Sequence, residues 1–308
     1  MRSLCLSLCL ATLLLPALRA AQPATDADFS TQGEYQAEGL GLQVVALGDG
    51  KFMAVRFTGG LPGAGGAKES RKTVEAVAQD GTVTFTWPDG AKTVLKGGAG
   101  THSAAGKDLA LGRVERQSPT LGAKPPEGAV VLFDGTSADA FAPGRIEDGL
   151  LCEGANSKQK FQSQTLHLEF RLPYLPKARG QGRGNSGCYL QGRYETQVLD
   201  SFGLEGRNNE CGGVYSIRDP DLNMCLPPMV WQTYDIDFTA AKFDAEGKKT
   251  ANARLTVRLN GVVVQNDIEL PKITTAAPNQ EGPGPGFLHL QNHGNPVRYR
   301  NIWVVEKP

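Results

Sequence analysis

Residues 184–201, with the sequence GNSGCYLQGRYETQVLDS, decide the fold class of this chain. The glycine-rich start suits a turn, and residues 187–191 and 194–199 suit two short strands that follow it. Successive side chains of a strand point to opposite faces of the sheet. Glu195 and Gln197 are therefore expected to share one face of their strand.

The rest of the chain repeats this pattern of short runs. Its 308 residues include 38 Gly and 19 Pro, and its apolar runs are bounded by Gly, Pro or Asn. Such runs are typical of all-β proteins, and Asn260-Gly261 predicts a tight hairpin. Roughly eleven short strands after residue 128 predict a two-sheet sandwich or jelly roll. They are 130–133, 150–153, 165–172, 187–191, 194–199, 214–217, 233–238, 253–259, 262–265, 286–291 and 298–305.

The chain divides into a leader, two β units and a connection between them. Residues 1–20 have the pattern of a cleaved signal peptide, with Arg2 before an apolar run too short to cross a bilayer. We therefore expect a secreted or periplasmic protein. Residues 21–118 are expected to form a small β accessory domain, with strands at 42–46, 52–57, 83–87 and 93–96, a strand or connector at 72–78, and His102 in a solvated turn. Residues 119–127 form a linker that contains Pro-Pro and Gly, and residues 128–308 form the jelly roll.

The amino-acid composition limits which partners the protein is expected to bind. The chain has 32 Lys and Arg against 32 Asp and Glu, so its net charge is zero. This balance argues against nucleic acid, which is bound by basic surfaces. No segment after the leader is long and apolar enough to span a membrane. The sequence does not indicate an oligomeric state.

Four cysteines follow the leader: Cys152, Cys188, Cys211 and Cys225. Export permits disulfides, and we expect Cys211 and Cys225 to pair across a loop rich in Gly, Pro and Asn. Closing a loop of about 15 residues is worth roughly 3 kcal/mol in the chain-entropy model. A cysteine-based zinc site is not expected, because the chain has no Cys-x-x-Cys pair.

Polar side chains alternate with apolar ones along two predicted strands. In strand 165–172, Glu169 and Arg171 lie opposite the apolar face, either as a solvated ion pair or as the lining of a ligand groove. In strand 286–291, His289 and Gln291 face outward. His293 follows in a turn crowded with Asn, which suits either a functional site or a hydrogen-bonded turn.

Further polar residues complete the candidate set. Arg298 and Arg300 share a face, and either could orient a carboxylate by bidentate hydrogen bonds. A strand that carries Glu195 and Gln197 side by side is typical of sugar-handling sheets. Asp200 lies at odd spacing from Glu195 and is expected on the opposite face. The pair is therefore a poor candidate for two-carboxylate retaining hydrolysis, which needs carboxyl groups about 5 to 5.5 Å apart.

The order of the motifs closely resembles the 3-keto-disaccharide hydrolase domain family over residues 128–305. The motifs that carry the resemblance are VLFDGT (131–136), NSG (185–187), YETQVLD (194–200), CGGVY (211–215), WQTYDI (231–236), LNG (259–261), LQNHG (290–294) and RNIW (300–303). The resemblance implies a concanavalin-like jelly roll in an exported bacterial protein, acting on glycosides oxidised to a ketone at C3. Many members have Asp where this chain has Asn292.

The chemistry implied by the resemblance needs a base, an acid and a group that stabilises an enolate. We expect Glu195 or His293 as base and acid, and Arg171 or Arg300 as the enolate stabiliser. Gln197, Asn185, Glu169 and Gln291 are expected to bind the sugar, together with Arg300. A divalent cation held by Glu195 and His293 could replace the arginine. The alternative is a lectin-like, non-catalytic carbohydrate-binding module.

Overall fold

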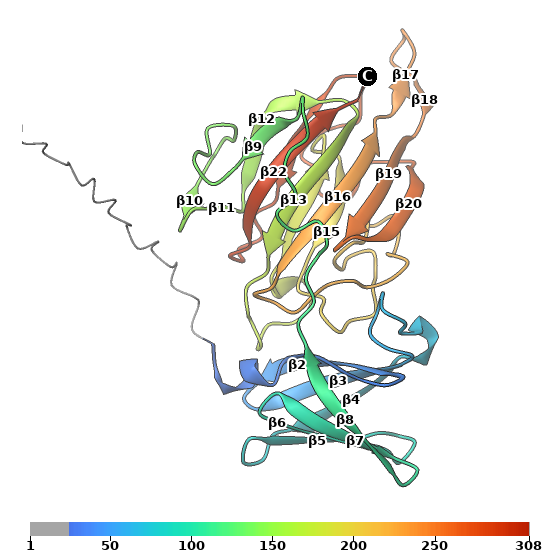
Figure 1. The fold of residues 1–308 in the computed structure, drawn as a ribbon. Helices are drawn as coiled ribbons and strands as arrows, with labels where there is room; N and C mark the ends of the chain where they lie inside the picture. Colours follow the sequence, from blue (N-terminus) through green and yellow to red (C-terminus); the bar gives the residue numbers. More distant parts are fainter. Residues whose placement is uncertain (1–24, 308) are drawn as a thin grey trace, which may run out of the picture.

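The computed structural model describes residues 25–307, so the predicted signal peptide lies outside the described residues. The described chain consists of two β modules joined by a long connection (Figure 1). Its helices are three short 3-10 turns, Ala27–Ser30, Lys68–Ser70 and Gly180–Gly182. Within residues 25–307, no helix has the length and apolar character that crossing a bilayer would require.

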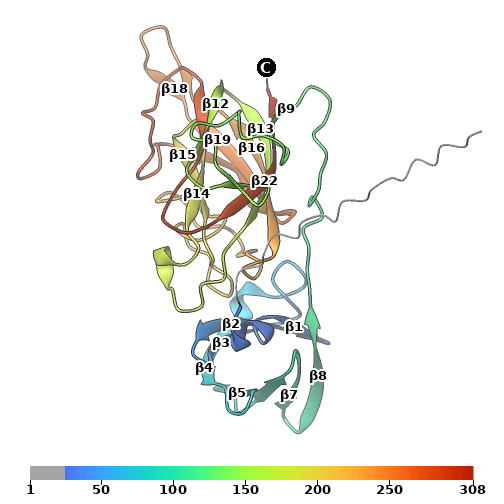
Figure 2. The ribbon, with the colours of Figure 1, turned by 90° about the vertical axis from the view of Figure 1, so that its left-hand side faces the viewer.

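The N-terminal module is one antiparallel sheet in the order β4-β3-β2-β1-β8-β7-β6-β5. The strands at its two ends, β4 and β5, are consecutive in sequence and meet at a turn from Gln79 to Thr82, so the sheet curls round on itself (Figure 2). Its strands are β1 Gly33–Ala37, β2 Leu40–Gly48, β3 Lys51–Thr58, β4 Lys72–Val77, β5 Thr82–Thr86, β6 Lys92–Lys96, β7 Ala99–Ala104 and β8 Lys107–Val114.

The sequence did not predict β1, β7 and β8. Gly and Ala, which have low strand propensity, are frequent in β7 and β8, and packing rather than propensity selects these strands. His102 lies in β7 and is 4% exposed. Its Nδ1 lies 2.8 Å from Thr93 Oγ1, so its expected position in a solvated turn is wrong.

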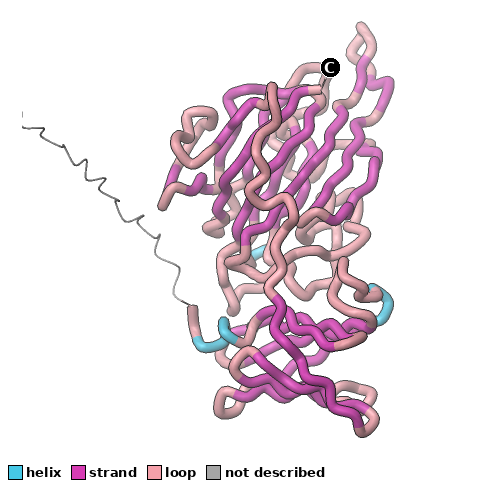
Figure 3. The backbone as a smooth tube through the Cα atoms, viewed as in Figure 1, coloured by secondary structure: helices cyan, strands magenta, loops and turns pink. Residues whose placement is uncertain are grey.

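The C-terminal module is a sandwich of two antiparallel sheets, the jelly roll that the sequence predicts, and Figure 2 shows the two layers edge-on. Figure 3 shows that strands and loops make up almost all of this module. The large sheet has the order β10-β11-β22-β13-β16-β19-β20, with β9 also on β22, and the small sheet has the order β12-β21-β14-β15. The strands are β9 Val130–Phe133, β10 Ile146–Glu147, β11 Leu150–Cys152, β12 Ala155–Phe161, β13 Gln164–Arg171, β14 Ser186–Leu190, β15 Tyr194–Val198, β16 Trp231–Thr239, β17 Lys242–Phe243, β18 Lys249–Ala251, β19 Ala253–Leu259, β20 Val262–Leu270, β21 Gly286–Leu290 and β22 Arg298–Glu306.

The core of the sandwich forms where apolar side chains of both sheets meet. Leu168 and Phe170 of β13 and Leu288 and Leu290 of β21 are completely buried in one cluster. Their neighbours in each strand therefore point away from the core, as alternation requires. The sandwich thus has two outward faces that can carry polar side chains, one on each sheet.

Asn260-Gly261 forms the predicted hairpin, with φ of 53° and 80°. The predicted strand 214–217 is wrong. Val214 makes only isolated bridges, and Ser216 adopts a φ of 58° that bends the chain into a turn. The predicted disulfide is also wrong, because Cys211 and Cys225 are buried free thiols. Cys211 Sγ lies 3.3 Å from the Tyr234 hydroxyl instead.

The two modules are in direct contact beside the small sheet. Arg183 Nη1 donates to Ala46 O at 3.2 Å, and Arg71 Nη2 donates to Gly203 O at 2.7 Å. Val45 of the N-terminal module belongs to the apolar core of the sandwich. The N-terminal module therefore helps to fix loops next to the sandwich.

Candidate active site

A row of polar side chains crosses the outward face of the small sheet. The strand register places Asn156 of β12 opposite His289 of β21, His289 opposite Tyr189 of β14, and Tyr189 opposite Glu195 of β15. Directly opposed residues of antiparallel strands point to the same face and have neighbouring Cβ atoms. We call these four residues the polar row.

Glu195 is the titratable end of the polar row. Glu195 belongs to β15, which is buried along its whole length, and the residue is 2% exposed. Burial raises the pKa of Glu195 to about 7, although a hydrogen bond with the Tyr189 hydroxyl lowers it in part. A carboxyl group that titrates near neutral pH is suited to accept a proton in one step and return it in another.

Hydrogen bonds orient the rest of the row. His289 Nδ1 lies 2.6 Å from Asn156 Oδ1, which can only accept, so Nδ1 carries the proton and Nε2 carries the lone pair. Burial lowers the pKa of His289, which favours the neutral ring. The His289 ring packs at 5.1 Å from the Tyr189 ring, and Gln291 Nε2 donates to the Tyr189 hydroxyl at 3.2 Å.

Tyr189 stays protonated at neutral pH. Burial and the charge of Glu195 both raise the pKa of its hydroxyl. A neutral phenol beside a carboxylate can donate a hydrogen bond to an oxygen that gains negative charge. The row thus combines a base, a phenol donor and a neutral imidazole on one face.

Gly187 creates the space that the Glu195 carboxyl occupies. It lies opposite Gln197 in the β14–β15 register, and a Cβ at this position would overlap Glu195 Oε1. The same Cβ would lie 2.7 Å from Tyr189 Cε2. Only glycine fits between these two members of the row.

Gly187→Ala is expected to displace the Glu195 carboxyl and lower turnover by roughly tenfold to a hundredfold, since small displacements of catalytic groups have effects of that order. Steady-state kinetics with the substrate proposed below would measure the loss. Gly112→Ala is the matched control, because a Cβ at Gly112 meets nothing within 4 Å. Equal activity of both variants would show that the carboxyl position is unimportant.

Two predicted sugar-binding residues lie beside the row. Gln197 is 1% exposed, and its Nε2 donates to Gln181 Oε1 at 3.0 Å. The side-chain Nδ2 of Asn185 donates to Gln181 O at 2.8 Å. Asn185 Oδ1, in contrast, is buried and finds no donor among residues 25–307. It is therefore a buried acceptor that lacks a partner in the described part of the chain.

Gln291 and His293 occupy the end of β21 and the turn after it. Gln291 joins the row through its hydrogen bond to Tyr189. His293 is exposed in the turn, and Asn295 of the same turn accepts from Asn185 N at 2.7 Å. Within residues 25–307, no three His, Cys, Asp or Glu side chains gather in a way that could hold a metal ion.

Arg171, Glu169 and Arg300 do not belong to this site, and their expected grouping with Glu195 is wrong. They lie on the outward face of the large sheet, separated from the polar row by the core of the sandwich. Glu169 Oε2 accepts from Arg300 Nε at 2.6 Å. The Arg171 guanidinium lies 5.1 Å from the centre of the Trp231 ring. None of the three can stabilise an oxyanion next to Glu195.

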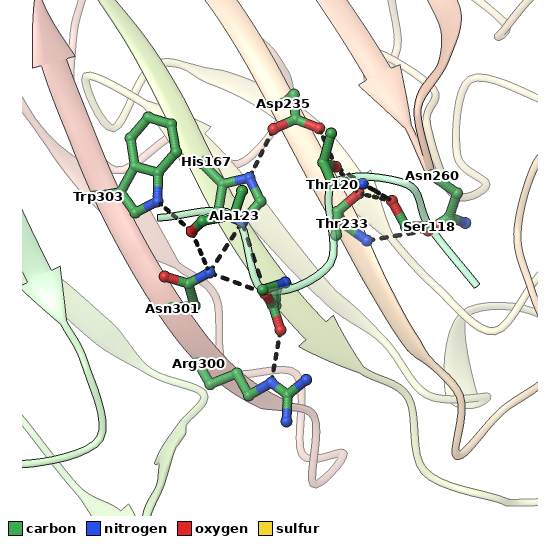
Figure 4. Close-up of polar contacts among 12 residues, drawn as sticks. Ser118, Thr120, Ala123, His167, Thr233, Asp235, Asn260, Arg300, Asn301 and Trp303 are labelled. Carbon is green, nitrogen blue, oxygen red and sulfur yellow. Dashed lines mark hydrogen bonds and ion pairs between the residues drawn. The ribbon is translucent and has the colours of Figure 1, made fainter. Parts of the chain in front are cut away.

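The connection between the modules covers this second face (Figure 4). Thr120 Oγ1 donates to Asp235 Oδ2 at 2.7 Å, and Gly122 N donates to Glu169 Oε1 at 2.6 Å. Asn301 Nδ2 donates to Ala123 O at 2.9 Å. We call residues 118–123 the strap. Its contacts give Glu169 a structural role.

Asp200 is also structural. It is 2% exposed, and its Oδ2 accepts from Arg183 Nε at 2.7 Å. Sequence reasoning missed three members of the polar row, Tyr189, His289 and Asn156. Alternation placed His289 on the outward face of its strand, but only the strand order brings it next to Tyr189.

Comparisons with known proteins agree with this architecture. Residues 128–305 match the model of the 3-keto-alpha-glucoside-1,2-lyase-like domain. A crystal structure named a "putative glycosyl hydrolase" from Parabacteroides distasonis ATCC 8503 is 34% identical, with a TM-score of 0.55, and the match covers 59% of this chain and 85% of that chain. A second structure of that name and organism is 18% identical, with a TM-score of 0.44 and coverage of 59% and 95%. Curated proteins gave no match.

Proposed function

Because this chain belongs to the 3-keto-alpha-glucoside-1,2-lyase-like family, we propose that it cleaves glycosides that carry a ketone at C3. The observation that carries the proposal is the buried Glu195, whose pKa is about 7, beside the Tyr189 phenol and the neutral His289 ring. The similarity to a structure named as a glycosyl hydrolase supports glycoside processing in general. The 3-keto substrate and the mechanism below are parts of the proposal.

The reaction begins at C2 of the sugar. The C3 ketone acidifies the C2 proton, and Glu195 removes it as general base. The C2–H electron pair moves into the C2–C3 bond, and negative charge develops on the ketone oxygen as an enolate. This charge needs a preorganised donor. The Tyr189 hydroxyl is the candidate, because its one proton, which bonds the Glu195 carboxylate before the reaction, is released when Glu195 takes up the C2 proton.

Elimination then breaks the C1–O bond. The enolate collapses to a C1–C2 double bond conjugated with the ketone, and the departing oxygen takes up one proton. Protonated Glu195 can supply that proton, since its pKa lies near neutral pH. Addition of water across C1 and C2 gives the free 3-keto sugar, and the sum is a hydrolysis. Asn185 Oδ1 and the Gln291 amide are candidates to hold sugar hydroxyls.

The ionisation of Glu195 determines how activity and stability are expected to depend on pH. As the free-enzyme base it must be ionised, so kcat/KM is expected to rise with pH and level off above the pKa of about 7. Stability should change in the opposite direction. A folded-state pKa above the unfolded value gives stability that is present below about 4.5 and lost as pH rises through 7. Kinetics and thermal unfolding between pH 5 and 9 would measure both trends.

The function is tested by incubating the signal-free protein with a 3-keto-glucoside and with its unoxidised parent, each with and without a chelator. Release of free 3-keto sugar from the oxidised substrate alone is the expected result. Loss of that activity with chelator would show that the site requires a divalent cation. Saturable binding of both sugars without turnover would replace the proposal with the lectin-like reading.

A further inference from the structure

The N-terminal module and the sandwich enclose a cavity of ≈ 400 Å³ at their junction. Its walls come from the start of β1, the end of β8 with the strap, and the segment that leads into β16. None of its lining residues belongs to the polar row. A cavity of this size falls within the range of small-molecule sites, roughly 300 to 1,000 Å³.

One wall of the cavity is apolar and rigid. Trp231 supplies aromatic surface, and Pro227 and Pro228 supply stiff backbone. Two guanidinium groups lie over the Trp231 ring, with Arg300 Cζ at 4.0 Å and Arg171 Cζ at 5.1 Å from the ring centre. Since Glu169 holds Arg300 in turn, the indole is fixed in place before any ligand arrives.

The other wall carries an unused hydrogen-bond donor. Gln32 is 1% exposed, and its Oε1 accepts from Ala46 N at 3.1 Å. Its Nε2 is buried and finds no acceptor within residues 25–307. A buried donor without an acceptor is unfavourable, so a ligand oxygen that accepts from Gln32 would satisfy it.

The charged side chains that line the cavity sum to zero, and one pair of them, Arg116 and Glu34, is held by hydrogen bonds. The lining includes two arginines, Arg113 and Arg116, and two glutamates, Glu34 and Glu115. Arg116 Nε donates to Glu34 Oε2 at 2.6 Å, and Gln43 Nε2 donates to Glu34 Oε1 at 3.0 Å. A neutral ligand with many hydroxyl groups suits a lining without net charge better than an ion does.

We propose that this junction cavity is a second, non-catalytic binding site for a neutral glycan. The apolar C–H face of a pyranose would pack on Trp231, and its hydroxyls would meet Gln32 and the exposed Gln117 on the opposite wall. The site depends on residues outside the segment 128–305, so it gives the N-terminal module a role in substrate capture. It goes beyond the catalytic proposal and does not require the elimination chemistry.

Calorimetric titration of the signal-free chain with maltose and with cellobiose tests the site. We expect saturable, millimolar binding of at least one disaccharide, and a weakening of at least tenfold in Trp231→Ala. Trp87 and Trp303 are 2% and 9% exposed, so a fluorescence change on binding would report mainly on Trp231. Glu195→Gln should bind as the wild type does, which separates this site from the polar row.

Three results would overturn the proposal: no saturable binding of either disaccharide, unchanged binding in Trp231→Ala, or loss of binding in Glu195→Gln alone. Thermal unfolding should accompany each variant. If Trp231→Ala does not fold, Gln117→Trp fills the cavity from an exposed position and should abolish binding in a folded protein. Normal binding in that folded variant would equally exclude the cavity.

Discussion

Glu195→Gln is expected to lower kcat/KM for a 3-keto-glucoside by roughly 10² to 10⁴, the usual contribution of a positioned general base. The amide keeps the shape of the side chain but cannot take the C2 proton. Burial disfavours the charged form of Glu195, so its replacement by a neutral amide should not impair folding. Turnover kinetics together with thermal unfolding would separate loss of chemistry from loss of structure.

Glu169→Gln is the matched control, because Glu169 is an equally buried glutamate, 1% exposed, on the other outward face of the sandwich. It should retain near-normal kcat/KM at temperatures where it is folded. Full activity in Glu195→Gln would remove Glu195 from the mechanism. An equal loss in both folded variants would show that the effect is not specific to the polar row.

Alternation along the strands predicted the outward faces but not which sheet carries each residue. Glu195, Glu169 and Arg171 all point away from the core, as the sequence pattern indicates. A sandwich has two outward faces, and the choice between them depends on strand order. That order is set by pairing between distant segments, such as β14 with β21. Glu195 and Arg171 were therefore assigned to one site although they lie on opposite faces.

The strand register explains why the sequence did not predict Asn156 and His289 as members of the polar row. Asn156 and His289 are 133 residues apart in sequence, yet they share a hydrogen bond. No local pattern carries that information. Composition likewise predicted that residues 119–127 form no regular structure, but it did not predict that Thr120 and Gly122 would bond to the sheet. Individual hydroxyl and backbone N–H donors attach the strap to the sheet. The amino-acid composition does not reveal such single donors.

We expect the largest effect on stability from Glu169→Gln, which removes the carboxylate that holds the strap. Burial alone would raise the pKa of Glu169, but hydrogen bonds from His167, Asn301, the Gly122 N–H group and Arg300 outweigh it and lower the pKa to about 2. The ionised carboxylate is therefore the form that holds the strap to the large sheet. Removing one partner of a fully buried pair costs about 3–5 kcal/mol. Because the Arg300 side chain is 38% exposed, we expect a smaller loss in Glu169→Gln, roughly 2 kcal/mol, since water can partly replace the carboxylate.

A loss of that size should lower the Tm of the sandwich, a module of about 180 residues, by roughly 4–8 °C at pH 7. A folded-state pKa below the unfolded value gives stability that is present above about 4.5 and lost as the pH falls toward 2. The wild type should therefore lose stability over this range, and Glu169→Gln should lose less. Glu75→Gln, at an exposed position of β4, is the control and should stay within about 0.5 kcal/mol of the wild type. If the Tm and acid profile of Glu169→Gln match those of Glu75→Gln, the strap is held by its hydroxyl and backbone contacts alone, and the carboxylate contributes nothing to its attachment.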